Sequence, residues 1–221
     1  LPPPPPPPPP APDSPPSDIW IPPGLWYQWN TSAALSSIAG PVVLKGLRYA
    51  LGELPLFAMA GAVVPTQTMQ RKHGPLVWII FPGTGNGSNY EDDGVSTQYQ
   101  VPSQGGISRT ALTHTLTTTA DAVSLGGGTT QHTVVISGQL TTSPLRRQQL
   151  QLRRVIGSQG APTSVVCDGA ALPELPPPST GDVLGTNSTA GWWVTPAADD
   201  SLWLAGGSLM VSLPLSSSDI S

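Results

Sequence analysis

The segment GPLVWIIFPG (74–83) contains six consecutive apolar residues, Leu76 to Phe81, between a Gly-Pro pair and a Pro-Gly pair. Valine, isoleucine, tryptophan and phenylalanine are enriched in β-strands, and glycine and proline mark turns. A short run of such residues with turn residues on both sides is typical of a strand. The segment therefore predicts a strand over 76–81 and a loop over 82–94.

Similar short runs recur along the chain, separated by turn residues. They lie at 19–21, 25–29, 41–44, 54–65, 96–101, 107–116, 131–137, 150–156, 164–167, 191–194, 201–204 and 208–213. This spacing predicts an all-β protein with two consecutive antiparallel β-sandwich domains. Only LKGLRYALGEL (44–54) has apolar residues at near-helical spacing, and its two glycines weaken that pattern.

The composition excludes a helical bundle. The 221 residues include 28 prolines, 24 glycines, 23 serines and 21 threonines, but only three glutamates and two lysines. Serine, threonine, glycine and proline favour turns and strand surfaces, whereas glutamate and lysine are the usual residues of exposed helix faces. The hydrophobic fraction of 38%, with seven tryptophans, is sufficient for a folded core.

The chain begins with an unbroken polyproline run, Pro2–Pro10. Residues 1–17 are predicted to be a disordered low-complexity segment in an extended left-handed helix, and we favour an insertion without a role over a spacer or an SH3-type ligand. A polar stretch at 66–74 suggests a boundary between domains at 18–72 and 73–216, followed by a tail at 217–221. A domain of about 55 residues is marginal alone and needs a neighbour.

The charge pattern does not favour nucleic acid as a partner. The net charge is −4, and the only basic cluster contains Arg146, Arg147, Arg153 and Arg154. No glycine-rich loop accompanies this cluster, so we expect solvated strand edges and not a phosphate site. No apolar run approaches the roughly 20 residues needed to span a bilayer. The single cysteine, Cys167, excludes an internal disulfide and is expected to be a small buried residue.

The only close acidic group is Glu91, Asp92 and Asp93, followed by Gly94. The favoured interpretation is a structural turn, because short polar side chains and glycine suit tight corners. The alternative is a calcium site, since calcium prefers clustered carboxylates, although the spacing lacks the alternating ligands of a calcium loop. A catalytic carboxyl pair is less favoured still. Apart from calcium, no cofactor is expected.

The three histidines, His73, His114 and His132, are scattered, and each is expected to be a solvated or strand-face residue and not a ligand. No GxSxG motif provides a serine nucleophile. Trp192 and Trp193 are consecutive, so on a strand they face opposite sides, and one of them is expected to be exposed or covered by a neighbour.

Four aromatic residues gather near the start of the first domain, namely Trp20, Trp26, Tyr27 and Trp29. Flat apolar rings with a polar edge can anchor a protein interface or stack on a sugar. Interface or core is favoured over sugar binding. Separately, Asn30, Asn86 and Asn187 each begin an N-x-S/T sequon, which suggests passage through the secretory pathway.

Three segments in order resemble the C-terminal region of family 31 glycoside hydrolases, which includes α-glucosidases and α-xylosidases. IWIPPGLWYQWN (19–30) resembles a strand pair of that region, and LPLFAMAGAVVP (54–65) resembles the segment that follows. NYEDDGVSTQY (89–99) resembles the acidic turn of the distal domain, and LRRVIGSQGAPTSVVCDGAAL (152–172) is a weaker match to its late strands. The resemblance covers about residues 18–213, although Met59 lies where the family usually has an arginine.

The resemblance implies a proximal and a distal β-sandwich that follow a catalytic (β/α)8 barrel. The barrel needs on the order of 250 residues of alternating strands and helices, and none are present. The family's catalytic carboxylates would lie in that barrel, so this chain alone is expected to be inactive. The expected partners are the barrel of a retaining α-glycosidase and α-glucan oligosaccharides. The alternative is a free-standing carbohydrate-binding or cell-wall module with a proline-rich spacer.

Overall fold

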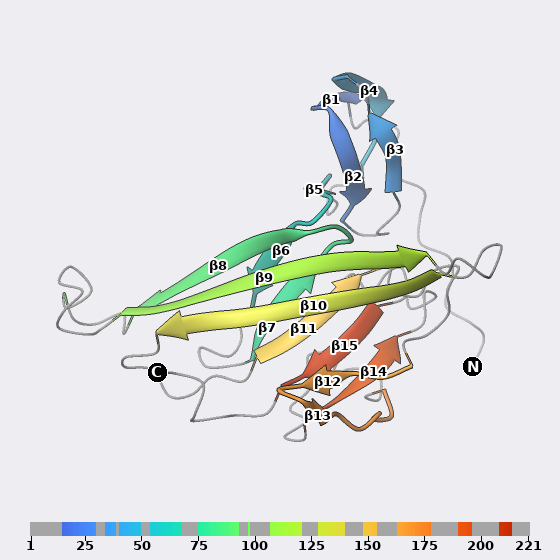
Figure 1. The fold of residues 1–221 in the computed structure, drawn as a ribbon. Helices are drawn as coiled ribbons and strands as arrows, with labels where there is room; N and C mark the ends of the chain where they lie inside the picture. Colours follow the sequence, from blue (N-terminus) through green and yellow to red (C-terminus); the bar gives the residue numbers. More distant parts are fainter. Residues whose placement is uncertain are drawn as a thin grey trace, which may run out of the picture. The chain divides into compact units, whose positions relative to one another are not determined.

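The protein is described by a computed structural model. It covers 15–29, 34–38, 40–49, 54–67, 75–92, 97, 107–120, 128–139, 148–153, 163–177, 190–195 and 208–213. All regular elements in these ranges are β-strands, so the predicted all-β class is confirmed (Figure 1). The polyproline run, the tail at 217–221 and the predicted strand at 201–204 lie outside the described residues. So does the predicted strand at 96–101, except for Thr97.

The chain divides into two compact units, Leu1–Met59 and Ala60–Ser221, here called unit 1 and unit 2. The sequence analysis placed a boundary between residues 72 and 73. Strand β6 (Val63–Thr66) lies before that point, but it pairs with β7 (Leu76–Ile80) and so belongs to unit 2. The polar stretch at 66–74 therefore connects two strands of one sheet.

Unit 1 contains two small sheets. In the first, β1 (Ser17–Ile21) pairs with β4 (Val42–Leu47). In the second, β2 (Gly24–Gln28) lies between β3 (Ala34–Ile38) and β5 (Phe57–Met59). Ile21, Tyr27 and Ala58 are its buried apolar residues among those described.

The segment 44–54 has near-helical spacing that its glycines weaken, and its first four residues belong to β4. Gly46 has a φ of 66°, in the left-handed region that other residues rarely adopt. Its N–H donates a hydrogen bond of 2.9 Å to Oδ1 of Asp18 on β1. The glycine thus permits a left-handed backbone conformation within β4, which a regular right-handed helix does not contain.

Unit 2 contains a five-stranded sheet in the order β14-β15-β11-β7-β6. Its remaining strands are β11 (Gln148–Arg153), β14 (Gly191–Thr195) and β15 (Ser208–Ser212). Strands β7 and β11 are parallel, so the prediction of purely antiparallel sheets is wrong here. A parallel pair needs a long crossover, and about 70 residues of chain separate these two strands.

Three long strands form the second sheet of unit 2, in the order β10-β9-β8. They are β8 (Gly85–Asp92), β9 (Ile107–Ala120) and β10 (Gly128–Gln139), and they lie across the five-stranded sheet (Figure 1). A short hairpin, β12 (Val166–Cys167) and β13 (Ala170–Ala171), completes the described strands.

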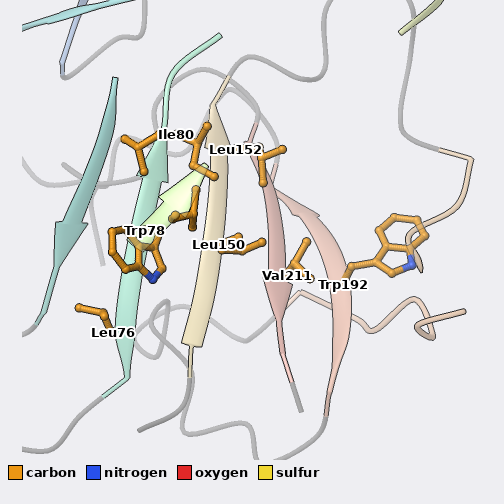
Figure 2. Packing of buried hydrophobic residues seen from close by; sticks show 9 residues of the cluster. Leu76, Trp78, Ile80, Leu150, Leu152, Trp192 and Val211 are labelled. Atoms are coloured by element: carbon orange, nitrogen blue, oxygen red, sulfur yellow. The ribbon is translucent and has the colours of Figure 1, made fainter. Parts of the chain in front are cut away.

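The core of unit 2 lies between its two sheets. Trp78, Ile80, Leu150 and Leu152 come from β7 and β11 (Figure 2). Leu112 of the same cluster comes from β9. All five side chains are 6% exposed or less. Val134 and Ile136 of β10 pack against the same cluster. Face-to-face packing of two sheets around an apolar layer is the predicted sandwich.

Strand β8 corrects the prediction of a loop over 82–94. Its sequence, GNGSNYED, is rich in turn residues, yet all eight residues pair with β9. A Cβ atom on Gly85 would collide with the backbone oxygen of Gly61, and one on Gly87 with that of Val63. The glycines are therefore required by close backbone approach, which is a known use of glycine inside strands.

Candidate functional site

Unit 1 exposes much of its apolar surface. Its exposed large apolar residues, here called the exposed apolar residues of unit 1, are Trp20, Val42, Val43, Leu54, Leu56 and Met59. Trp20 is the most prominent aromatic, with 61% of its surface exposed. It lies directly opposite Val43 across β1 and β4. Met59 lies opposite Trp26 across β5 and β2.

The four aromatic residues selected from the sequence have different surroundings. Tyr27 is buried at 6% exposure and lies in the core of unit 1. Trp26 is half-buried, and its Nε1 donates a hydrogen bond of 3.0 Å to the Pro22 carbonyl. Trp29 is also half-buried, and its backbone N–H donates to the Leu56 carbonyl at 2.9 Å. Trp20 alone among them presents most of its ring to solvent.

The acidic group does not form the predicted turn in the part that is described. Glu91 and Asp92 belong to β8, where they pair with Ser108 and Ile107 of β9, and Asp93 lies outside the described residues. Within the described ranges, no three His, Cys, Asp or Glu side chains are placed to hold a metal ion. Since Asp93 lies outside the described residues, the calcium alternative stays a prediction.

The structure brings together two histidines that the sequence analysis treated as scattered. Nε2 of His114 on β9 lies 3.0 Å from Nδ1 of His132 on β10. His114 is fully buried and His132 is half-buried, so of the two expected settings, solvent or a strand face, His114 has the strand face. The third histidine, His73, lies outside the described residues. A signal was available, because both residues fall on neighbouring predicted strands.

The second face of β11 is unexpectedly polar and buried. Gln149, Gln151 and Arg153 alternate along β11 and are each at most 2% exposed. The Arg153 guanidinium lies 5.3 Å from the centre of the Phe81 ring, which allows a cation–π contact. Burial lowers the pKa of Arg153 to about 10. The prediction of a solvated strand edge is therefore wrong for Arg153.

The remaining predicted residues are partly described. Cys167 is half-buried and not buried as expected, and its Sγ lies 3.6 Å from Oδ2 of Asp168. Trp192 belongs to the core cluster, and Trp193 on the other face is 1% exposed, so both are covered. Asn86 is exposed on β8, whereas Asn30 and Asn187 lie outside the described residues. In the part of the chain that is described, no helix is long and apolar enough to cross a membrane.

Comparison with solved structures supports the fold that the resemblance predicted. A GH31 dextranase of Flavobacterium johnsoniae, complexed with isomaltotriose, matches 92% of this chain at 18% identity and a TM-score of 0.62. A cycloalternan-forming enzyme of Listeria monocytogenes, complexed with a pentasaccharide substrate, matches 93% at 15% identity and a TM-score of 0.50. The chain corresponds to 23% of the dextranase and 16% of the Listeria enzyme. No family model and no curated protein matches the sequence.

Proposed function

We propose that this chain is the C-terminal, non-catalytic β-sandwich region of a family 31, α-glucosidase-like glycoside hydrolase. The fold comparison carries this proposal. Nearly the whole chain matches the dextranase, but the match covers only 23% of the dextranase, whose own chain is much longer. The partner would be a (β/α)8 catalytic domain. Its substrates would be α-glucans, hydrolysed at O-glycosyl bonds.

The exposed apolar residues of unit 1 support an interface role. Large exposed aromatic and aliphatic side chains mark surfaces that another protein covers, and Trp is enriched at the centre of such interfaces. Trp20 and Val43 oppose each other on one sheet and are 61% and 43% exposed. A unit of this size with three buried apolar residues among those described also benefits from burial against a neighbour.

Catalysis by the chain itself is not expected. Retaining glycosidases need two carboxyl groups about 5–5.5 Å apart, one of them with a raised pKa. In the family that the resemblance indicates, both carboxylates would lie in the barrel domain, whereas the regular elements of the described residues are all β-strands. Purified chain should therefore not hydrolyse 4-nitrophenyl α-glucoside or maltose. Turnover that a single carboxyl substitution abolishes would contradict this.

The interface is tested by co-expression with the barrel segment encoded in the same gene. We expect the chain alone to self-associate and the pair to form a soluble complex. Trp20→Ser combined with Val43→Ser should weaken the complex at least about tenfold, because central apolar anchors carry most interface energy. Val135→Ser is the matched control, since Val135 is 57% exposed in unit 2. Absence of any such barrel segment, or equal effects of both variants, would contradict the proposal.

Sugar binding by a free-standing module is the second candidate, and the exposure of Trp20 favours it specifically. An exposed indole face can stack on a sugar ring. Maltoheptaose would then shift the tryptophan emission of a monomeric chain in a saturable way, and Trp20→Ser would remove the shift. Self-association without a shift would favour the interface. We also propose that the chain passes through the secretory pathway, since Asn86 begins a sequon and is exposed. The test is to secrete the chain from a eukaryotic host and to measure the mass of the peptide that contains Asn86. If Asn86 is glycosylated, this mass falls after enzymatic deglycosylation.

A further inference from the structure

The inner face of the three-stranded sheet contains a histidine pair. Strands β9 and β10 are antiparallel, with Val134 opposite His114 and Leu116 opposite His132. The two histidines are therefore diagonal neighbours on one face, at a separation that lets long side chains meet. Their ring centres are 5.2 Å apart with planes inclined by 19°, and Nε2 of His114 is 3.0 Å from Nδ1 of His132.

This contact limits how many protons the pair can carry. A hydrogen bond between two imidazoles needs a proton on one nitrogen and a lone pair on the other. The pair can therefore keep the bond with no extra proton or with one. When both rings are protonated, two N–H groups face each other, the bond is lost and two positive charges lie within about 5 Å.

Among the described residues, no charged group other than the two histidines faces the pair. Strands β6 and β7, which belong to the facing sheet, contain only uncharged residues. The core-facing residues of β11 are Leu150 and Leu152. Gly85 of β8 lies directly opposite His114. His114 is 0% exposed, and its Nδ1 has no hydrogen-bond partner within the described ranges.

The charged groups of the neighbouring strands lie farther away. Glu91 of β8 is half-buried but pairs with Ser108, six residues along β9 from His114, which is about 20 Å at strand spacing. Arg109 of β9 is exposed. Arg153 of β11 alternates with the core-facing Leu152, so it lies on the other face of its sheet. The nearest titratable group to each histidine, among described residues, is therefore the other histidine.

Burial and this pairing both disfavour the charged rings. Burial lowers the pKa of His114 from its ordinary value of 6.5, although the Gly83 backbone beside the ring acts in the opposite direction without forming a well-aligned bond. Burial also lowers the pKa of His132, and the positive charge of His114 lowers it further. At acidic pH the unfolded chain therefore binds more protons at these two histidines than the folded chain does.

We propose that His114 and His132 form an acid-sensitive latch within the β8–β9–β10 sheet: at neutral pH the uncharged pair stays on the inner face of the sheet, and on acidification its protonation loosens β9 and β10 from the core. Leu112, two residues before His114, inserts into the core cluster, so movement of β9 opens that cluster. The sign follows from linkage. A group whose pKa is lower in the folded state destabilises the fold as pH falls below its unfolded value, here 6.5.

The test compares unfolding of the full chain in urea at pH 7.5 and pH 5.0, a range in which few groups other than histidine titrate. If one histidine stays unprotonated in the folded chain, the unfolding constant of the wild-type chain rises about thirtyfold across this range. His132→Gln should reduce that rise, and His114→Gln/His132→Gln should remove most of it. His73→Gln is the control and should retain the wild-type rise.

Two further measurements on the wild-type chain do not depend on the folding of any variant. Imidazole NMR titration should give both pair histidines pKa values below 6.5, with a hydrogen-bonded tautomer at pH 7.5. Hydrogen exchange, corrected for its intrinsic pH dependence, should accelerate in β8–β10 before β7 and β11 at pH 5.0. Ordinary pKa values for both residues, or equal pH dependence in the wild-type and double-variant chains, would overturn the latch.

Discussion

Unit 1 and unit 2 use strands of similar composition but differ in what their sheets enclose. Among the described residues, unit 1 buries three apolar side chains and unit 2 buries thirteen. Six of the nine exposed large apolar residues belong to unit 1. Unit 2 folds two sheets around its own core, whereas the described residues of unit 1 leave a larger share of large apolar side chains exposed. Two parts of one enzyme-like region can therefore differ in how much apolar area each buries by itself.

The largest expected effect contrasts two tryptophans. Trp78 is fully buried in the core of unit 2, and its Nε1 donates a hydrogen bond of 2.6 Å to Oε1 of Gln148. Trp78→Ala should lower the free energy of unfolding by about 3–5 kcal/mol, because it leaves a large cavity and an unpaired glutamine oxygen. Trp20→Ala in unit 1 should change it by less than about 0.5 kcal/mol. Urea unfolding followed by circular dichroism measures both.

Equal losses for the two variants would contradict the difference between the units, because Trp20 would then be part of a core. A second outcome is that Trp20→Ala lowers stability only in a complex with a barrel domain. In that case the exposed indole contributes to an interface and not to the folding of unit 1.

The all-β class and most strands followed from short β-forming runs between turn residues, as in 76–81 and 191–194. Strand β3 was missed because its sequence, ALSSI, contains two serines and no aromatic residue. Strand β8 was missed because its glycines are typical of a loop, whereas their cause is a neighbouring backbone. The parallel pairing of β7 with β11 joins residues distant in sequence, and no local pattern encodes it.

The candidate site was predicted only in part, because it too depends on pairing between residues that are distant in sequence. Trp20 was selected by its residue type, but its exposure and the burial of Tyr27 depend on which sheet each residue joins. The histidine pair depends on the register of two strands. His114 and His132 lie 18 residues apart, and a shift of the hairpin by one residue would place them on opposite faces. Arg153 was assigned to solvent from its charge, but its strand is covered on both faces.

The second effect tests whether close backbone packing distinguishes unit 2. Gly85→Ala places a methyl group against the backbone of Gly61, which cannot yield as a flexible side chain can. The free energy of unfolding should fall by about 1–3 kcal/mol. Gly40→Ala in unit 1 is the matched control, because no atom lies within 4 Å of its added methyl group. Thermal unfolding of the two variants should give a clearly lower midpoint for Gly85→Ala alone.

The smallest effect concerns what holds unit 1 together in place of a large core. Asp18 Oδ1 accepts the Gly46 N–H across β1 and β4 at an exposed position, where a hydrogen bond contributes about 0.5–1.5 kcal/mol at most. Asp18→Ala removes the acceptor and should accelerate hydrogen exchange of β1 and β4 amides severalfold, with no change in β7 or β11. Asp18→Asn keeps an acceptor oxygen and should retain most of the protection. If Asp18→Ala leaves β1 and β4 unchanged, their pairing does not need this bond, and burial of Ile21 is the stronger support for the first sheet. If the effect spreads to unit 2, the two units unfold together and the comparison between them loses its energetic basis.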